Sequence, residues 1–446
     1  MKRKETIINK IAKVLLTVLC CFVFVVPTLS SQALAEVKKE AAHVVLTPVP
    51  DTPLSYDAAT QTITIAGVCN TDEIYAYTHE GGEAVNAITL RFAASSVIET
   101  RQYNPSGGAQ PDQAKGPFAN TGLHTIVADA DARVSFVGTE AQPQPTLFAF
   151  FYKCAELASI DGLSSWDVSN VTGNFCMANM FQDCAQLKTL DGLASWDISS
   201  VRGSYCFASL FFRCTGLVSL DALSAWNVSG VTGSHCMSSM FYKCSALTSL
   251  NGLSNWNVSS VTSDFCMESM FDGCSSLTSL DGLAAWNTHN VNGSYCMMNL
   301  FANCTALTSL DGISSWDVAN VHGIYCMSYM FRNCNQLASV DGLSAWNNSL
   351  ACSSANGVTG FFYGCSALAS ITLGGSSGFL LSDDMNLLDT AYWWPVDVQD
   401  EPVAVNTDRL IEESASEAPI SLRWQMCTSG KESPMLPADN PSITWP

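Results

Sequence analysis

Charged residues are scarce in this 446-residue chain: Asp, Glu, Lys and Arg make up 13% of it, about half the usual share. Basic residues are the scarcer kind, with 20 Lys and Arg against 40 Asp and Glu and a net charge of −20. Because so acidic a chain is repelled by phosphate backbones and anionic lipid surfaces, its composition argues against nucleic-acid and membrane-surface partners.

The sequence also has little that could assemble a catalytic or metal centre. The His-Glu-x-x-His and Gly-x-x-x-x-Gly-Lys-Ser/Thr patterns are absent, and no short Cys-x-x-Cys pair is present to bind zinc. The six histidines are scattered along the chain, without a constellation around a nucleophile. We therefore expect no enzymatic activity, no metal site and no cofactor.

The one long apolar run lies at the start of the chain. Five basic residues within the first thirteen precede an apolar stretch at 14–26, and Ala33-Leu34-Ala35 follows it. This arrangement predicts a signal peptide over residues 1–35, too short in its apolar part for a membrane span. Removing its five basic residues and one acidic residue from 20 and 40 leaves 15 and 39, a net charge of −24. We expect a secreted protein, which could be cell-surface associated, with no integral membrane span after signal removal.

A thirty-residue period dominates the rest of the sequence. A fixed period of this length is typical of a solenoid, in which each unit buries its apolar face only against its neighbours. Two columns of residues mark the period without a slip. The tryptophan column is Trp166, Trp196, Trp226, Trp256, Trp286, Trp316 and Trp346, and the first cysteine column is Cys154, Cys184, Cys214, Cys244, Cys274, Cys304 and Cys334.

Each unit combines two apolar spacings. Leucines and the tryptophan fall at every third residue around an Asp-Gly turn, which predicts a tight coil with a very short strand. In the second unit Phe207, Leu210, Phe211 and Cys214 then follow at i, i+3, i+4 and i+7, which predicts a helix of about two turns. The expected fold is α/β: a leucine-rich-repeat-like solenoid of about seven 30-residue coils.

The repeat divides the chain into segments. Residues 36–146 carry no repeat, and alternating runs within them predict a β-rich N-terminal cap. The solenoid spans 147–370, and residues 371–427 predict a small β-containing C-terminal cap. Residues 428–446 are rich in proline and have little apolar pattern, which is typical of a flexible tail.

The repeat unit resembles that of the BspA-like leucine-rich-repeat surface proteins. The resemblance rests on Ser159–Leu163, Trp166–Thr172 and the Met180-Phe181-x-x-Cys184-x-x-Leu187 pattern, together with their later copies. It implies a non-catalytic adhesin-like protein that binds host or microbial proteins. Two features depart from the family: each unit inserts residues such as Gly173–Cys176, and the C-terminus lacks a sortase signal.

Two repeated columns admit more than one interpretation. The insert adds a second cysteine column, and export would permit disulfides, whereas the first column lies on the apolar stripe and favours a buried role. An aspartate column suggests a calcium ladder, but its Asp-Gly context favours a turn that accepts backbone hydrogen bonds. The second cysteine column is Cys176, Cys206, Cys236, Cys266, Cys296 and Cys326, and the aspartate column is Asp161, Asp191, Asp221, Asn251, Asp281, Asp311 and Asp341.

One aromatic column lies outside the core pattern, in the inserted turn. Its exposure would create a linear recognition surface for a protein or a glycan, whereas burial would make it a wedge that closes the turn. These residues are the candidate ligand-binding site, and we call them the aromatic ladder: Phe175, Tyr205, His235, Phe265, Tyr295 and Tyr325.

The function expected from the sequence is protein–protein interaction or adhesion, with a host or microbial surface protein as partner. The alternative is a carbohydrate-binding module in which the exposed aromatic ladder grips sugar rings.

Signal cleavage gives a first prediction. The mature N-terminus should be Glu36, because Ala33 and Ala35 stand where a signal peptidase requires small residues. The intact mass of the secreted protein measures this directly. A secreted species that retains residues 1–35 would contradict it.

Overall fold

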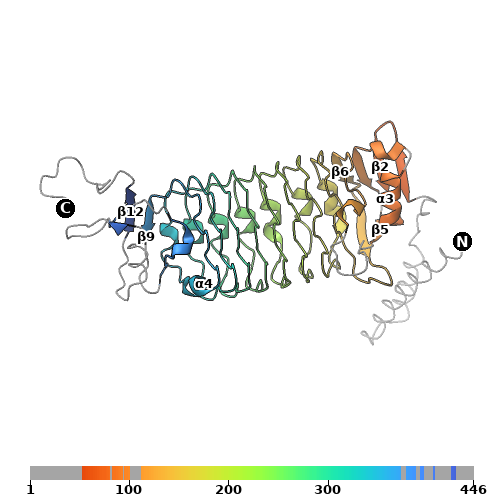
Figure 1. Cartoon of the computed structure of the whole chain (residues 1–446). Helices are drawn as coiled ribbons and strands as arrows, with labels where there is room; N and C mark the ends of the chain where they lie inside the picture. Colours follow the sequence, from red (N-terminus) through yellow and green to blue (C-terminus); the bar gives the residue numbers. More distant parts are fainter. Residues whose placement is uncertain are drawn as a thin grey trace, which may run out of the picture. The chain divides into compact units, whose positions relative to one another are not determined.

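A computed structural model describes residues 53–80, 83–93, 95–100, 112–372, 378–387, 392–395, 405–406 and 423–427. The predicted signal peptide, the Glu36 N-terminus and the predicted tail lie outside these residues. Between 147 and 370 the chain forms a repeat solenoid, whose coils lie side by side in Figure 1.

Each coil turns at its Asp-Gly-Leu segment, where a short 3-10 helix forms every thirty residues. The turn predicted from Asp-Gly is therefore confirmed, as is the solenoid itself. These helices are η3 (Asp161–Ser165), η4 (Asp191–Leu193), η5 (Asp221–Ala225), η6 (Asn251–Leu253), η7 (Asp281–Leu283), η8 (Asp311–Ile313) and η9 (Asp341–Leu343).

The predicted two-turn helix is wrong. In the second unit this segment is a series of turns in which every fourth residue has a positive φ: 59° at Tyr205, 54° at Ser209 and 58° at Arg213. An α-helix requires φ near −63° throughout. A left-handed residue at every fourth position redirects the chain but still turns Phe207, Leu210 and Phe211 inward, so the two structures share one apolar spacing.

We call these turns the turn wall: residues 173–184 and their equivalents every thirty residues. Alternate N–H groups in it donate to the next coil, as from Phe175 to the Ser204 carbonyl (2.9 Å) and from Met177 to the Cys206 carbonyl (3.0 Å). Intervening N–H groups close turns within the coil, as from Ala178 to the Phe175 carbonyl (3.2 Å). The wall satisfies its backbone groups without a helix or a regular strand.

The short strand predicted near the start of each unit is present only at the ends of the array. The first coil contains β8 (Trp166–Asp167), and single bridges join Thr125 to Ser159 and Ser339 to Ser370. No strand is assigned between 168 and 369, which the structure describes in full. The backbone contacts there are sparse and long, such as Thr248 N–H to the Val218 carbonyl at 3.5 Å.

Before the repeats, the chain forms two four-stranded sheets. One has the order β1-β2-β4-β6 and is parallel except at the antiparallel β1–β2 pair, and the other is the parallel sheet β3-β5-β7-β8. The second sheet ends on β8, so the strands run directly into the first repeat. The strands are β1 (Leu54–Asp57), β2 (Thr62–Ile65), β3 (Val68–Asn70), β4 (Thr89–Phe92), β5 (Ser95–Glu99), β6 (Thr125–Ala128) and β7 (Arg133–Val137).

Helix α3 (Thr71–His79) lies at this end of the stack. It begins with a capping box in which the Asn70 side chain accepts from Glu73 N–H and the Glu73 carboxylate accepts from Asn70 N–H. Its last residues cover carbonyl groups of the 112–121 segment: the Thr78 hydroxyl donates to Pro117, and a His79 ring nitrogen lies 2.5 Å from the Ala119 carbonyl oxygen. The short helices η1 (Glu83–Asn86) and η2 (Gln113–Lys115) complete this region.

At the other end, the last coil donates to a separate segment. Gly360 N–H and Phe362 N–H bond to the Asp384 and Met385 carbonyls of η11 (Asp383–Met385), so these two donors of the last turn wall are satisfied. Helix α4 (Ser349–Ser353) interrupts the last coil. A sheet of order β11-β10-β12-β9 follows, formed by β9 (Ser370–Thr372), β10 (Tyr392–Pro395), β11 (Val405–Asn406) and β12 (Arg423–Cys427).

One core runs through the whole stack, from Ile63 to Leu387. The tryptophan column lies within it as a continuous series of stacked rings, with centroids 6.0–6.4 Å apart and planes within 8° of parallel. Each ring from Trp196 onward donates its indole N–H to a carbonyl of the preceding coil, as Trp256 does to Leu223 at 3.0 Å. The predicted core role of this column is confirmed.

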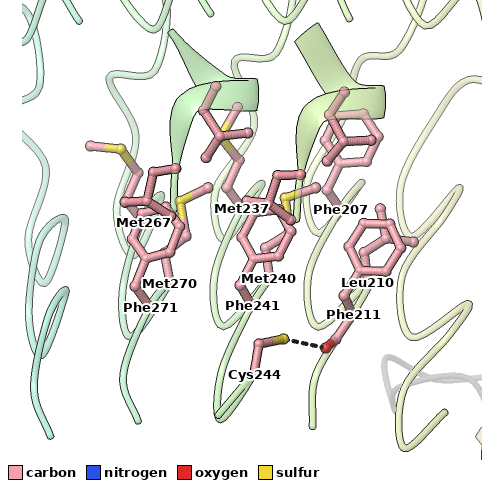
Figure 2. Packing of buried hydrophobic residues seen from close by; sticks show 14 of the residues in the cluster. Phe207, Leu210, Phe211, Met237, Met240, Phe241, Cys244, Met267, Met270 and Phe271 are labelled. Atoms are coloured by element: carbon pink, nitrogen blue, oxygen red, sulfur yellow. Dashed lines mark hydrogen bonds between the residues drawn. The ribbon is translucent and has the colours of Figure 1, made fainter. Parts of the chain in front are cut away.

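A phenylalanine column parallels the tryptophans, with centroids 5.5–5.7 Å apart from Phe151 to Phe331. Figure 2 shows Phe211, Phe241 and Phe271 of this column aligned one after another along the stack, with methionine side chains such as that of Met240 packed between the coils. Every coil thus presents the same shape to both neighbours, and a large ring meets a large ring at each interface.

The tryptophan column predicts a mutational cost. Trp256→Ala should lower the free energy of unfolding by about 3–5 kcal/mol, because it opens a cavity in the core and leaves the Leu223 carbonyl without its donor. Chemical denaturation measures the effect, with Thr262→Ala, at an exposed position of the same coil, as the control. Equal losses in the two variants would contradict a core role for Trp256.

Candidate functional site

The aromatic ladder forms a continuous stack on the outer side of the turn wall. Successive ring centroids are 4.3–5.2 Å apart and the planes lie within 18° of parallel. All six side chains are half-buried. Each ladder residue has φ between 54° and 59°, so the left-handed turn position determines where every ring points.

This geometry lies between the two arrangements considered from the sequence. The rings do not fold into the core, and they are not an open row of separate platforms. Each inner ring is covered on both faces by its neighbours, so that its edge remains to meet solvent. For Tyr205, Tyr295 and Tyr325 the phenol group adds a polar, hydrogen-bonding position to that edge.

Small residues and a few rings support the first part of the ladder. A cluster separate from the main core contains Ala178 and Ala208, which lie three residues after Phe175 and Tyr205 in their own coils, and both rings pack against this cluster. Phe148 meets Phe175 edge to face at 6.3 Å, and Tyr152 belongs to the same cluster. The N-terminal end of the ladder therefore packs against a small buried apolar cluster.

A second, shorter row of rings, Tyr152, Phe212 and Tyr242, lies seven residues beyond the ladder position of the first coils and is interrupted by Gln182. The sequence analysis did not single it out. Phe212 and Tyr242 stack at 4.6 Å, and the Lys243 ammonium lies 5.1 Å from the Tyr242 centroid. Lys153 lies over Tyr152 in the same way, also at 5.1 Å. A thirty-residue step between aromatic residues appears here only from Phe212 to Tyr242, because other coils carry Gln, Asp, Ala or Arg at this position.

His235 is the one titratable imidazole in the ladder. Its ring stacks between Tyr205 and Phe265, 4.3 Å from each, and its Nδ1 lies 2.9 Å from the Ser234 hydroxyl. Burial lowers the pKa of His235 below its ordinary value of 6.5, although the carboxylates of Glu268 and Asp264 act in the opposite direction. The neutral ring is therefore the form that the stack favours.

Both cysteine columns are buried, and the cysteines from Cys69 to Cys365 are free thiols. In the first column each thiol lies within hydrogen-bonding distance of a phenylalanine carbonyl in the preceding coil, as Cys244 does to Phe211 at 3.2 Å (Figure 2). Burial raises the pKa of Cys176 and of Cys236 to about 12, which suppresses the reactive thiolate. The expected core role is confirmed for the first column, and the second column, whose role the sequence left open, is buried as well.

The aspartate column lies on the surface, with Asp341 partly covered. Asp161 and Asp281 accept from the serine hydroxyl two residues earlier, at 3.1 and 3.2 Å, instead of from the backbone N–H groups that we expected. At other positions, such as Asp221, the serine oxygen accepts from the backbone N–H of the column residue. The backbone-capping role belongs to a neighbouring column that includes Asp167 and Asn227, whose side-chain oxygens accept from the N–H two residues later. Within the described residues no cluster of His, Cys, Asp and Glu could hold a metal ion.

The described part of the chain contains no helix long and apolar enough to cross a membrane.

Comparison with known proteins places the repeats in a family. Residues 146–267 and 235–371 match the model of a family described as "Mycoplasma protein of unknown function, DUF285". The two overlapping matches cover just over half of the chain. The chain belongs to the DUF285 family. Neither the curated proteins nor the solved structures include a chain that matches it.

The position of His235 predicts a pH dependence. Because its pKa is lowered in the folded protein, the stability that the neutral ring contributes is present above about pH 6.5 and is lost as the pH falls through the folded pKa. His235→Phe should therefore reduce the fall in the melting midpoint between about pH 7.5 and about pH 5. Thermal melts of both proteins measure this. An equal fall in both would show that the pKa of His235 is the same in the folded and unfolded chains.

Proposed function

We propose that this protein is a secreted or cell-surface-associated, non-catalytic adhesin that binds a host or microbial surface protein along its aromatic ladder. The observation that carries the proposal is the ladder itself: six half-buried rings in register, one per coil, supported by a hydrogen-bonded backbone wall. Partly exposed aromatic edges beside small residues are typical of protein interaction surfaces. Contacts that are individually weak gain affinity when they are repeated along one line.

The finer assignment of the family and the fold belongs to the same proposal. The repeat unit supports membership of the BspA-like group within leucine-rich-repeat surface proteins. We assign the solenoid to about seven coils over 147–370, with 36–146 as the N-terminal cap and 371–427 as the C-terminal cap. The contacts of α3 with Pro117 and Ala119, and of η11 with Gly360 and Phe362, support the assignment of caps, because they satisfy backbone groups at the ends of the turn wall.

The ladder geometry favours a protein partner over a sugar. A sugar ring packs against an aromatic face, and neighbours 4.3–5.2 Å away leave no room for it between the rings. An extended polypeptide can instead run across the ring edges and bond to the tyrosine hydroxyl groups. The carbohydrate-binding alternative would need the terminal ring faces of the stack.

Replacing ladder residues tests the proposal. Tyr205, Phe265, Tyr295 and Tyr325 changed together to Ser should abolish capture of host or microbial surface proteins by the mature protein. Because these rings are only half-buried, the melting midpoint should fall far less than for the buried Trp256→Ala.

A matched variant with Ser249, Ser279 and Ser309 changed to Ala, at half-buried positions on another face, serves as the control. Capture that survives in the ladder variant would refute the proposed site. Saturable binding to a glycan array, with no protein captured, would favour the alternative.

A further inference from the structure

The few basic residues of the repeats are not spread evenly over the surface. Residues 147–370 contain six Lys and Arg, and three of them occupy one column, which we call the 183 column after its second position. This column borders the second row of rings on the outer side of the turn wall. It reads Lys153, Asp183, Arg213 and Lys243 in the first four coils, and Gly273, Asn303 and Asn333 after them.

Two ammonium groups in this column are placed to meet a partner. Arg213 pairs with Asp183 at 3.1 Å, so those two charges largely neutralise each other. Lys153 and Lys243 are exposed, and each lies over the ring of the preceding tyrosine, 5.1 Å from the centroid. A cation held over a ring has fewer conformations to lose when it meets a carboxylate.

Elsewhere the repeat surface is acidic. The exposed Asp-Gly turns and the neighbouring turn-capping column contribute carboxylates from Asp161 and Asp167 in the first coil and from their equivalents in later coils. An acidic partner is therefore repelled by most of the repeat surface and attracted to the exposed lysines of the first four coils of the turn wall. Such an arrangement selects both the partner and its place of binding.

We propose that the outer turn wall of the first four coils binds an extended, acidic polypeptide segment that also carries aromatic or apolar side chains. The inference rests on the proposed function and names the chemistry of the partner. The exposed ladder edges at Phe175, Tyr205 and His235 contact the apolar side chains. Lys153 and Lys243 pair with its carboxylates.

The coil spacing sets the distance between those carboxylates. Lys153 and Lys243 are three coils apart, or about 15 Å if coils are spaced like neighbouring strands at about 4.8 Å. An extended chain advances about 3.3 Å per residue, and side chains on one face recur at every second residue. Two acidic residues four positions apart, with an apolar residue between them, match this spacing.

Single-stranded nucleic acid is the other ligand class that uses rings and cations together. The net charge of −20 opposes it, because a phosphate backbone would meet two free ammonium groups and many carboxylates. An acidic peptide with only two charges matched to two cations does not suffer that repulsion along its whole length. The charge balance therefore favours the polypeptide.

Fluorescence anisotropy with labelled peptides tests this on the full mature chain. The probe is an eleven-residue Gly/Ser peptide with Glu at two positions four residues apart and Phe midway between them; sister peptides carry Gln or Lys in place of Glu. The Glu peptide should bind about tenfold more tightly than the Gln peptide at low salt, with the difference lost at high salt. The Lys peptide should bind most weakly.

Variants of the chain locate the site. Lys153→Glu/Lys243→Glu should remove the preference for Glu, and Lys153→Gln/Lys243→Gln should reduce it, which keeps the test valid if charge reversal disturbs folding. Lys188→Glu is the matched control for the single variant Lys243→Glu, because it reverses the charge of an exposed lysine on another face. It should leave binding of the Glu peptide unchanged.

Each outcome decides a different claim. If the Glu, Gln and Lys peptides bind equally, the proposal of an acidic partner is wrong. If the ladder variant then binds none of the three peptides, the result still supports protein docking on the ladder. Equal effects of Lys188→Glu and Lys243→Glu overturn the assigned place. If none of the peptides binds, this inference is wrong. The capture of surface proteins then tests the proposed function separately. Tight binding of an oligothymidine probe that is lost in the Lys153/Lys243 variants would assign the surface to nucleic acid instead.

Discussion

The hydrogen bonds between neighbouring turn walls are the constraint on which the rest of this structure depends. Every second N–H group of a wall bonds to a carbonyl of the next coil, and several of the intervening groups, such as Ala178 N–H, close turns within the coil. This pattern requires a left-handed residue at every fourth position, a conformation that costs most non-glycine residues on the order of 1 kcal/mol. The chain adopts this conformation in every coil because, without it, the buried N–H and carbonyl groups of the wall would not meet their partners in the next coil.

A fixed backbone repeat makes equivalent side chains meet. The tryptophan and phenylalanine columns, the two thiol columns and the aromatic ladder all follow from one coil lying in register on the next. Since each coil contacts mainly its two neighbours, the stability of the stack is close to a sum of coil and interface contributions. The buried thiols fit this arrangement as small apolar groups whose high pKa keeps them unreactive while the stack is folded.

The outer side of the same wall carries the candidate function. The left-handed position that the backbone requires is also the position from which each ladder ring projects, so structure and recognition share one residue per coil. The rings are therefore ordered before any partner arrives, which lowers the conformational entropy lost on binding. Within the described repeats, the alanines that pack beneath the ladder and the lysines that lie over tyrosine rings occur only in the first four coils. One end of the regular stack therefore differs chemically from the other.

The sequence by itself determined the solenoid, its thirty-residue coil, the Asp-Gly turns and the burial of the tryptophan column and the first cysteine column, because these depend on local spacing repeated without change. It did not distinguish a helix from a series of turns at Phe207–Cys214, since both place the same residues inward. Only the tertiary structure shows that non-repeating strands such as β3 and β5 pair into the same stack, because parallel pairing joins residues distant in the chain. The half-buried stacking of the ladder was likewise decided by contacts between coils: whether Tyr205 points inward or outward depends on the ring thirty residues away, which no local pattern specifies.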